Sequence, residues 1–346
     1  MFVRKTALTN RRRLAWALCA VLANSTAALG GQSGYHLLRT VTLGGSGGWD
    51  QINLDPASGN LFITRGTHVM VVDPDTGKLI ADIVGLQGIH DTAFTDGRAY
   101  ITEGGSNKVA VLDTKSFSRL SEISVGRSPD GILYDPASED VFTFNGSDDA
   151  TAVDPASGNV IGTVLLGGKP EAGASDGKGT IFVNIQDKNE LVAFDAMSLV
   201  VKAHYPLASC ESPSGIAADI AHWLIFSGCA NGVTVATEMY GGKSVASIPI
   251  GRGVDANRYD PGMKLVFSSN GESGTLTIAR EVNPLKFRVL ENIATAPGAR
   301  TMEQDPKTQR VFLVTADQRP GTPTSEQPHP RPVPVPGTFR LLIFGL

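Results

Sequence analysis

The sequence lacks the patterns that would assign it to the common enzyme and cofactor classes. It has three cysteines and six scattered histidines, with no Gly-x-Ser-x-Gly, His-Glu-x-x-His, phosphate-loop or Cys-x-x-Cys-His motif. These motifs place a nucleophile, a zinc ion, a nucleotide phosphate or a haem at fixed geometry. We therefore predict no catalytic residues and favour a function without catalysis.

Long apolar runs are also missing. The main apolar segment, Leu14 to Ala23, has ten residues, which is too few to span a bilayer. It follows five basic residues and precedes Ser25-Thr26-Ala27, an order typical of a cleaved export signal. We predict a signal peptide over residues 1–27, a periplasmic or secreted mature protein and no membrane insertion.

Positive charge is scarce in the mature chain. The signal peptide takes five of the 30 basic residues and none of the 34 acidic ones, which leaves 25 against 34, a net charge of −9. Nucleic-acid binding requires a basic surface, and no basic stripe is visible. We therefore expect no nucleic-acid partner, and we expect a monomer.

A repeat of about 42 residues organises the chain. Its clearest copy, residues 129–167, has four short segments rich in β-branched and aromatic residues, separated by Asp-Pro, Asn-Gly and Ser-Gly turns. One such unit predicts a four-stranded antiparallel sheet. The aspartate at its first corner recurs at steps of 39 to 45 residues, at Asp55, Asp96, Asp135, Asp176, Asp219, Asp260 and Asp305. Seven units of this length predict an all-β, seven-bladed β-propeller.

The two ends of the chain predict how the ring closes. The seventh unit lacks a fourth strand, whereas Leu37 to Leu43 is an extra strand at the N-terminus. We predict one domain over residues 36–346 in which this strand completes the last blade and removes an open edge. A proline-rich insertion, residues 316–337, interrupts the seventh blade on the face that we call the top. It is either a cover for the channel mouth or a surface loop.

The repeat also carries a family resemblance. Its pattern of Gly-x-x-Pro-x-x-Ile, Asp-Pro, aromatic-Val-Thr, Val-x-Val-x-Asp and Val-Gly resembles the YVTN or YncE-like seven-bladed β-propellers over residues 36–346. The resemblance implies an exported bacterial protein. Some YncE-like proteins bind DNA, a property that the acidic mature chain does not support.

Two cysteines, Cys210 and Cys229, remain after signal cleavage. If the hairpin turns around Ile220, they lie almost opposite each other, and export places them in an oxidising compartment. We predict a disulfide, with two free buried thiols as the alternative.

A ring of polar residues is predicted where the first strands reach the top of the channel. Five positions before the corner aspartates stand Asp50, Asp91, Asp130, Glu171, Ser214, Asp255 and Arg300. The candidate ligand-binding residues are Asp50, His90, Asp91, Asp130, Glu171, Asp255 and Arg300, with Arg300 as the only counter-charge within the ring. Asp91 and Asp130 are candidate ligands of Ca²⁺ or Mg²⁺, which prefer oxygen donors. Alternatively, the carboxylates cap backbone N–H groups.

Two functions fit these features. The first is an exported binding or scaffold module with a small-molecule or protein partner at the channel mouth. The second is a metal-dependent propeller enzyme of the lyase or lactonase type that uses the acidic ring. A tightly bound metal would favour the enzyme, and co-purification with a partner protein would favour the binding module.

Overall fold

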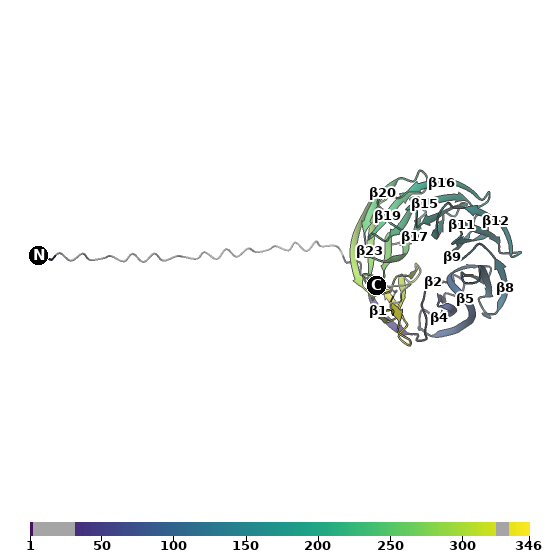
Figure 1. Cartoon of the computed structure of the whole chain (residues 1–346), viewed down its shortest axis with the longest axis horizontal. Helices are drawn as coiled ribbons and strands as arrows, with labels where there is room; N and C mark the ends of the chain where they lie inside the picture. Colours follow the sequence, from purple (N-terminus) through teal and green to yellow (C-terminus); the bar gives the residue numbers. More distant parts are fainter. Residues whose placement is uncertain (3–31, 323–331) are drawn as a thin grey trace. The chain divides into compact units, whose positions relative to one another are not determined.

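Seven antiparallel blades, two of them joined in one sheet, lie around a common axis (Figure 1). The computed structural model describes residues 1–2, 32–322 and 332–346, and these residues form strands and turns without a helix. The ring lies within the compact unit Gly31–Leu346. The predicted signal peptide, apart from residues 1–2, and residues 323–331 of the insertion lie outside the described residues.

In each blade, the first strand is the innermost. Blades one and two contain β2 (Ile52–Leu54), β3 (Leu61–Thr64), β4 (Gly66–Val72), β5 (Leu79–Thr95), β6 (Arg98–Glu103), β7 (Lys108–Asp113) and β8 (Arg119–Ser124). Blades three and four contain β9 (Pro129–Asp135), β10 (Asp140–Asn145), β11 (Asp149–Asp154), β12 (Asn159–Leu165), β13 (Pro170–Ser175), β14 (Thr180–Ile185), β15 (Glu190–Asp195) and β16 (Val200–Pro206).

The remaining blades follow the same order. Blades five and six contain β17 (Pro213–Asp219), β18 (Leu224–Cys229), β19 (Val233–Glu238), β20 (Ser244–Pro249), β21 (Val254–Asp260), β22 (Leu265–Asn270), β23 (Thr275–Asn283) and β24 (Lys286–Ala294). Blade seven contains β25 (Met302–Asp305), β26 (Arg310–Thr315), β29 (Arg340–Gly345) and β1 (His36–Thr42). The predicted seven-bladed fold is confirmed.

Strand β1 closes the ring as predicted. It pairs antiparallel with β29, with Val41 opposite Leu341 and Leu37 opposite Phe344, and β29 pairs in turn with β26. The N-terminal segment therefore covers what would be an open edge of the last blade.

Blades one and two share a strand that the repeat did not predict. Strand β5 is the outer strand of blade one and continues as the inner strand of blade two, which joins both blades in one sheet. Gly88 in this strand has a φ of 59°, and a Cβ there would lie 2.9 Å from the backbone nitrogen of Gly105. Only glycine fits this close approach without strain.

The core lies between neighbouring blades. Middle strands are buried on both faces, so their sequences read as nearly continuous apolar runs, whereas the outer strand β16 alternates between exposed and half-buried residues. Between blades three and four, Phe142 and Phe194 pack with ring centroids 5.6 Å apart, beside Ile181 and Val183. This packing fixes the inner strands, which carry the channel mouth.

Corner aspartates hold the turns at the bottom rim. In blade three, Asp135 Oδ2 accepts hydrogen bonds from the backbone nitrogen and the hydroxyl of Ser138, at 2.8 and 2.9 Å. The same bond to a hydroxyl three residues later recurs between Asp55 and Ser58 and between Asp305 and Thr308. Because these hydrogen bonds join residues close in sequence, each turn has an aspartate at a fixed position, and the repeat could be recognised in the sequence.

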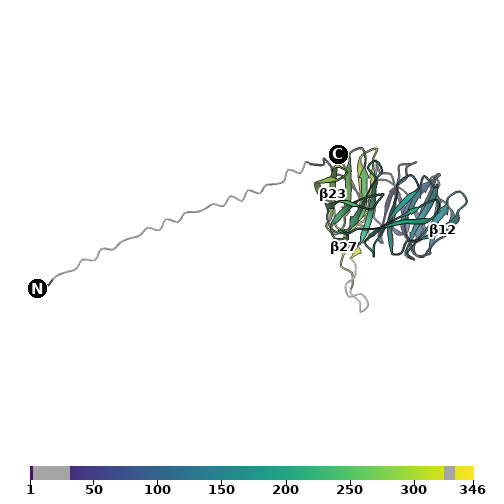
Figure 2. The same cartoon turned by 90° about the horizontal axis from the view of Figure 1, so that it is seen from above.

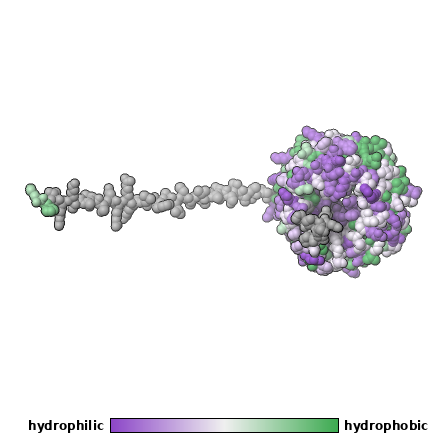
Figure 3. All heavy atoms as spheres, viewed as in Figure 1, coloured by the Kyte–Doolittle hydropathy of each residue, from purple (hydrophilic) through white to green (hydrophobic). Residues whose placement is uncertain are grey.

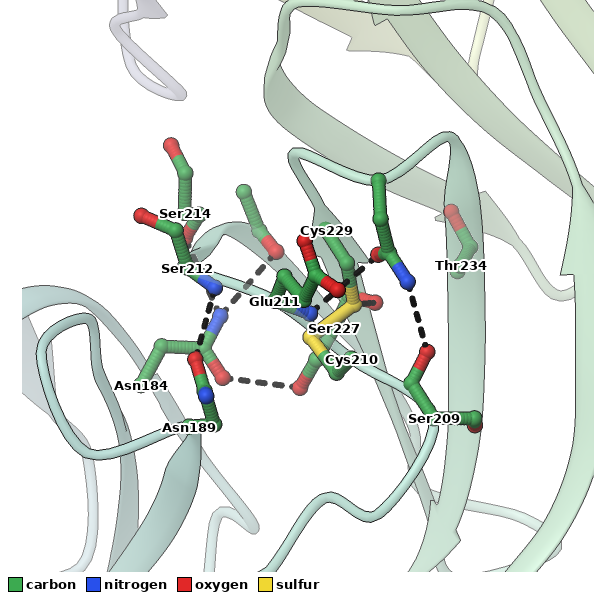
Figure 4. The surroundings of a disulfide bond; sticks show 12 residues. Asn184, Asn189, Ser209, Cys210, Glu211, Ser212, Ser214, Ser227, Cys229 and Thr234 are labelled. Carbon is green, nitrogen blue, oxygen red and sulfur yellow. Dashed lines mark hydrogen bonds between the residues drawn. A yellow bond between two sulfur atoms is a disulfide. The ribbon is translucent and has the colours of Figure 1, made fainter.

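Cys210 and Cys229 form a disulfide, with Cα atoms 5.3 Å apart (Figure 4). Ile220 lies in the turn, which occupies residues 220–223, but the predicted register is wrong, because Cys229 pairs with Pro213 and not with Cys210. Cys210 therefore lies in the loop before β17 rather than across the hairpin. The disulfide fastens this loop to β18, next to Ser212 and Ser214.

The insertion in blade seven begins and ends with a short ribbon. Strands β27 (Gln318–Arg319) and β28 (Val333–Pro334) pair antiparallel, so part of the insertion joins a sheet ladder despite its prolines. Figure 2 shows β27 at one rim of the propeller. Among the described residues, no helix has the length and apolar character needed to cross a membrane.

Candidate functional site

A cavity of about 1100 Å³ occupies the top end of the channel. All seven predicted ligand-binding residues line it, namely Asp50, His90, Asp91, Asp130, Glu171, Asp255 and Arg300. Ser214 completes the set, which we call the mouth ring, and Gln318 and Pro332 from the insertion also line the cavity. Hydrophilic residues predominate on the described part of the face in Figure 3.

Hydrogen bonds between blades fix the backbone of the mouth ring. The hydroxyls of Thr64 and Thr102, on second strands, donate to the carbonyls of His90 and Asp130 in the next blade, each at 2.7 Å. In blade four, Asn184 Nδ2 donates to the carbonyl of Ser214 at 3.0 Å. These hydrogen bonds satisfy buried carbonyls and hold the backbone of the ring residues in place.

His90 links two carboxylates of the ring. Its Nδ1 lies 2.8 Å from Asp50 Oδ2 and 3.5 Å from Asp130 Oδ1. One ligand atom from each of these three residues lies within 4.8 Å of the others. The hydrogen bond to Asp50 raises the pKa of His90, although burial acts in the opposite direction. His90 is thus a second basic group of the ring beside Arg300, a role that the sequence-based prediction had not recognised.

Arg300 joins the other side of the ring. Its Nε donates to Asp255 Oδ2 at 2.7 Å, and its Nη2 lies 3.5 Å from Asp50 Oδ1. Ser214 donates its hydroxyl to Asp255 Oδ1 at 2.6 Å. Among the residues five positions before the corner aspartates, Ser214 and Arg300 are the two that are not carboxylates. Ser214 and Arg300 therefore both donate hydrogen bonds to the carboxylate of Asp255.

Asp91 differs from the other ring carboxylates. Its Oδ1 accepts a hydrogen bond from the backbone nitrogen of Thr92 at 2.8 Å, and its Oδ2 accepts one from the backbone nitrogen of Ile132 at 3.2 Å. Burial raises the pKa of Asp91 to about 7. It lies outside the Asp50–His90–Asp130 group, and its contacts are those of a residue that caps backbone N–H groups between two blades.

Glu171 has the least satisfied carboxylate of the ring. Lys169 Nζ forms an ion pair with Glu171 Oε2 at 3.3 Å and donates a hydrogen bond to Gln186 Oε1 at 2.6 Å. Glu171 Oε2 is buried and accepts no hydrogen bond from the described residues. Burial, followed by the charge of Asp130, raises the pKa of Glu171 to about 7. A buried acceptor without a hydrogen bond is costly, so this oxygen, although within ion-pair distance of Lys169, favours a further donor from outside the chain.

The pKa values of Asp130 and Asp255 are shifted in the same direction. Burial raises the pKa of Asp130 to about 6, with His90 acting to lower it, and burial also raises the pKa of Asp255. Burial lowers the pKa of Arg300, but the charges of Asp255 and Asp50 outweigh it and the net pKa is raised. Burial therefore disfavours the charged forms of Asp130 and Asp255, while Arg300 stays cationic beside them.

A further ion pair lies deeper in the channel and was missed. Arg258 Nε donates to Glu303 Oε1 at 2.9 Å, between the inner strands of blades six and seven, and Arg258 also lines the cavity. Both residues stand two positions before their corner aspartates, where the other blades have Asn53, Phe94, Leu133, Ala174 and Ala217. That contrast was available in the repeat and could have identified the pair.

No protein-family model and no curated protein matches this chain. Solved structures do match it. One titled "Crystal Structure of Mitotic Checkpoint Complex" has a TM-score of 0.72 and 14% identity, and covers 98% of this chain and 99% of that one. "Crystal structure of RRP9 WD40 repeats" has a TM-score of 0.69 and 10% identity, and covers 90% and 97%.

A third solved structure also matches the fold of this chain. "Kuenenia stuttgartiensis Hydrazine Synthase" has a TM-score of 0.69 and 15% identity, and covers 78% of this chain and 92% of that one. The fold is a WD40-like β-propeller. Because 1737 chains match and these identities are low, the likeness establishes the fold and leaves function to the site.

Proposed function

We propose that this propeller is an exported binding module that holds a small polar ligand in the cavity at the channel mouth. The proposal rests on Glu171 Oε2, a buried acceptor that has Lys169 at ion-pair distance but no hydrogen bond, in a cavity that also presents Asp50 and Asp130. Such acceptors suit a ligand with ammonium or hydroxyl groups. Binding of a protein partner at the top face is an alternative within the same class.

The family and location are part of the proposal. The Asp-Pro corners and Val-Gly strand ends support a YVTN or YncE-like propeller, and residues 1–27 support export to the periplasm or the medium. The intact mass of the exported protein tests the cleavage site. The net charge of −9 and the acidic mouth support neither nucleic-acid binding nor membrane binding. We also propose a monomer.

A metal-dependent enzyme of the lyase or lactonase type is the second candidate. The convergence of Asp50, His90 and Asp130 favours it, with Mg²⁺ or Ca²⁺ as the candidate cofactor. Two features oppose a cation there: Arg300 lies 3.5 Å from Asp50, and the raised pKa of His90 favours its protonated form. We therefore place the binding module first.

Thermal unfolding with defined ligands tests the proposal. We would compare the wild type with Glu171→Gln and with Glu122→Gln on outer strand β8, in the presence of spermidine, glucose, MgCl₂ or CaCl₂. A ligand present at 100 times its Kd adds about 2.7 kcal/mol to the free energy of unfolding. We expect spermidine or glucose to raise the midpoint of the wild type and the Glu122 variant, with a smaller effect in Glu171→Gln. Equal shifts in all three proteins would place binding elsewhere, and a shift with MgCl₂ or CaCl₂ alone would favour the enzyme.

A further inference from the structure

A second cluster of ligating side chains lies on the bottom rim, at the opposite end of the inner strands from the mouth ring. Asp219 ends β17 of blade five, and His222 follows in the turn to β18. Glu281 comes from β23 of blade six. His222 Nδ1 lies 2.7 Å from Asp219 Oδ2 and 2.9 Å from Glu281 Oε1. Three ligand atoms from two blades therefore converge.

Both His222 and Glu281 depart from the repeat. Three residues after the first-corner aspartates, the other blades have residues that do not ionise, whereas blade five has His222; the others are Ser58, Ala99, Ser138, Gly179, Met263 and Thr308. One residue after the second corner, blades two, four and five have Thr114, Ala196 and Met239, where blade six has Glu281. Corner geometry alone does not require either change. His222 and Glu281 nevertheless contact each other across the boundary between blades five and six.

The charges in this cluster are not balanced by arginine or lysine. The side chains of Asp219 and Glu281 are each 1% exposed. Elsewhere, Arg119 lies 3.3 Å from the buried Glu103. In the part of the chain that the structure describes, neither Asp219 nor Glu281 has an arginine or lysine within 4.0 Å. Burying two carboxylates around one imidazole is costly unless a cation joins them.

One oxygen of the cluster has no hydrogen bond. Glu281 Oε2 accepts from the hydroxyl of Tyr259, whereas Glu281 Oε1 is buried and lacks a hydrogen-bonding partner among the described residues. The nearby Nδ1 of His222 bonds to Asp219 Oδ2 at 2.7 Å, and a neutral imidazole has only one N–H to donate. Glu281 Oε1 thus faces the ring nitrogen with its lone pairs unused, an arrangement suited to a metal ion.

We propose that Asp219, His222 and Glu281 bind a divalent transition-metal ion, with zinc as the experimental probe. The donors would be Asp219 Oδ2, His222 Nδ1 and Glu281 Oε1, whose atoms lie within 4.8 Å of one another. An imidazole with carboxylates suits zinc, and Ca²⁺ requires more oxygen ligands. The His222 side chain is 30% exposed, which leaves room for water as a fourth ligand. The ion would replace the Nδ1 proton and connect blades five and six.

Isothermal titration of the mature protein with ZnCl₂ tests this site. We expect one equivalent to bind, with proton release that appears as a dependence of the heat on the ionisation enthalpy of the buffer. His222→Ser restores the serine found at Asp55 and Asp135 corners, so the fold should persist, and Glu281→Gln removes the charge of the third ligand. Each variant should weaken zinc binding at least 100-fold. CaCl₂ should not displace the ion.

Asp130→Asn in the mouth ring is the matched control and should bind zinc as the wild type does. If His222→Ser and Glu281→Gln bind zinc with wild-type affinity, the proposal is wrong. Loss of zinc binding in Asp130→Asn alone would place the ion at the mouth and would also overturn it. Absence of binding to the wild type at 100 μM ZnCl₂ would overturn it as well.

Discussion

Arg300 and Asp255 form a hydrogen-bonded ion pair across the boundary between blades seven and six, with 2.7 Å between Nε and Oδ2. The same guanidinium donates to the carbonyl of Trp49 in blade one at 2.8 Å. One side chain therefore connects three consecutive blades at the point where the ring closes. Loss of the Arg300 side chain should therefore lower both the free energy of unfolding and the affinity for a ligand.

We predict that Arg300→Gln lowers the free energy of unfolding by about 2 kcal/mol at pH 8, because Asp255 and Asp50 lose their cation. The loss should be smaller at pH 5. Asp255 has a raised pKa, so acid neutralises the carboxyl that Arg300 would otherwise have to balance. Urea unfolding at the two pH values measures both effects. An equal loss at pH 5 and pH 8 would mean that packing, rather than charge, accounts for the role of Arg300.

The mouth ring should also give the whole protein an unusual dependence on pH. The pKa of Glu171 is raised to about 7 and that of Asp130 to about 6, so the folded state holds more protons than the unfolded chain between pH 5 and pH 8. Unfolding free energy falls with pH wherever the folded state binds the extra protons. Glu171 alone should contribute a decline of about 2 kcal/mol over this range.

Glu171→Gln should flatten that decline, because glutamine does not titrate. The control is Asp113→Asn at a corner turn, where hydrogen bonds from Ser116 lower the pKa of Asp113. A carboxyl with a lowered pKa titrates below pH 5, so this variant should keep the wild-type slope. Urea unfolding at several pH values between 5 and 8 measures the slopes. If Glu171→Gln and the wild type have parallel slopes, Glu171 does not take up a proton in this range.

Most of the fold could be predicted from the sequence because its determinants are local. Corner aspartates such as Asp135 bond to residues three positions away, so each turn leaves a mark at a fixed spacing. Strand register was harder to predict from the sequence. The turn after Asp219 has four residues, so the centre of the hairpin lies beyond the predicted position at Ile220. The disulfide was still predicted correctly, because Cys210 reaches Cys229 from the preceding loop.

The candidate site was predictable in position and less so in its interactions. Alignment on the corners placed seven residues around one cavity, since equivalent positions of a repeat lie at equal height on the axis. It could not show that His90 lies between Asp50 and Asp130, because that contact depends on side-chain rotamers in three different blades. The cluster of Asp219, His222 and Glu281 was missed for the same reason.

The disulfide should stabilise the loop that carries part of the cavity wall. Cys210 and Cys229 are 19 residues apart in sequence, and a loop of this length corresponds to about 3 kcal/mol in the chain-entropy model. We predict that replacing both cysteines with serine lowers the unfolding free energy by about that amount. Dithiothreitol should lower the stability of the wild type and leave the double variant unchanged. Two reactive thiols in the denatured, unreduced mature protein would show that the bond does not form.

Substitutions of Asp91 and Asp130 should distinguish a carboxylate that stabilises the fold from one that binds the ligand. The Asp91 carboxylate accepts from the backbone nitrogens of Thr92 and Ile132, so Asp91→Ala would leave two N–H groups without partners. We predict a loss of about 2 kcal/mol in unfolding free energy for this variant. Asp130 accepts no backbone N–H among the described residues, and its Oδ1 lies 3.5 Å from His90 Nδ1.

Asp130→Asn should therefore change stability by less than about 1 kcal/mol at pH 7, because asparagine removes a carboxylate that burial already disfavours. In the spermidine and glucose titrations, however, this variant should lose affinity, since the proposed ligand donates to the carboxylates around the cavity. Asp91→Asn, which keeps an oxygen acceptor for one of the two N–H groups, should retain affinity for the ligand. Equal losses of affinity in Asp91→Asn and Asp130→Asn would assign both carboxylates to the binding site.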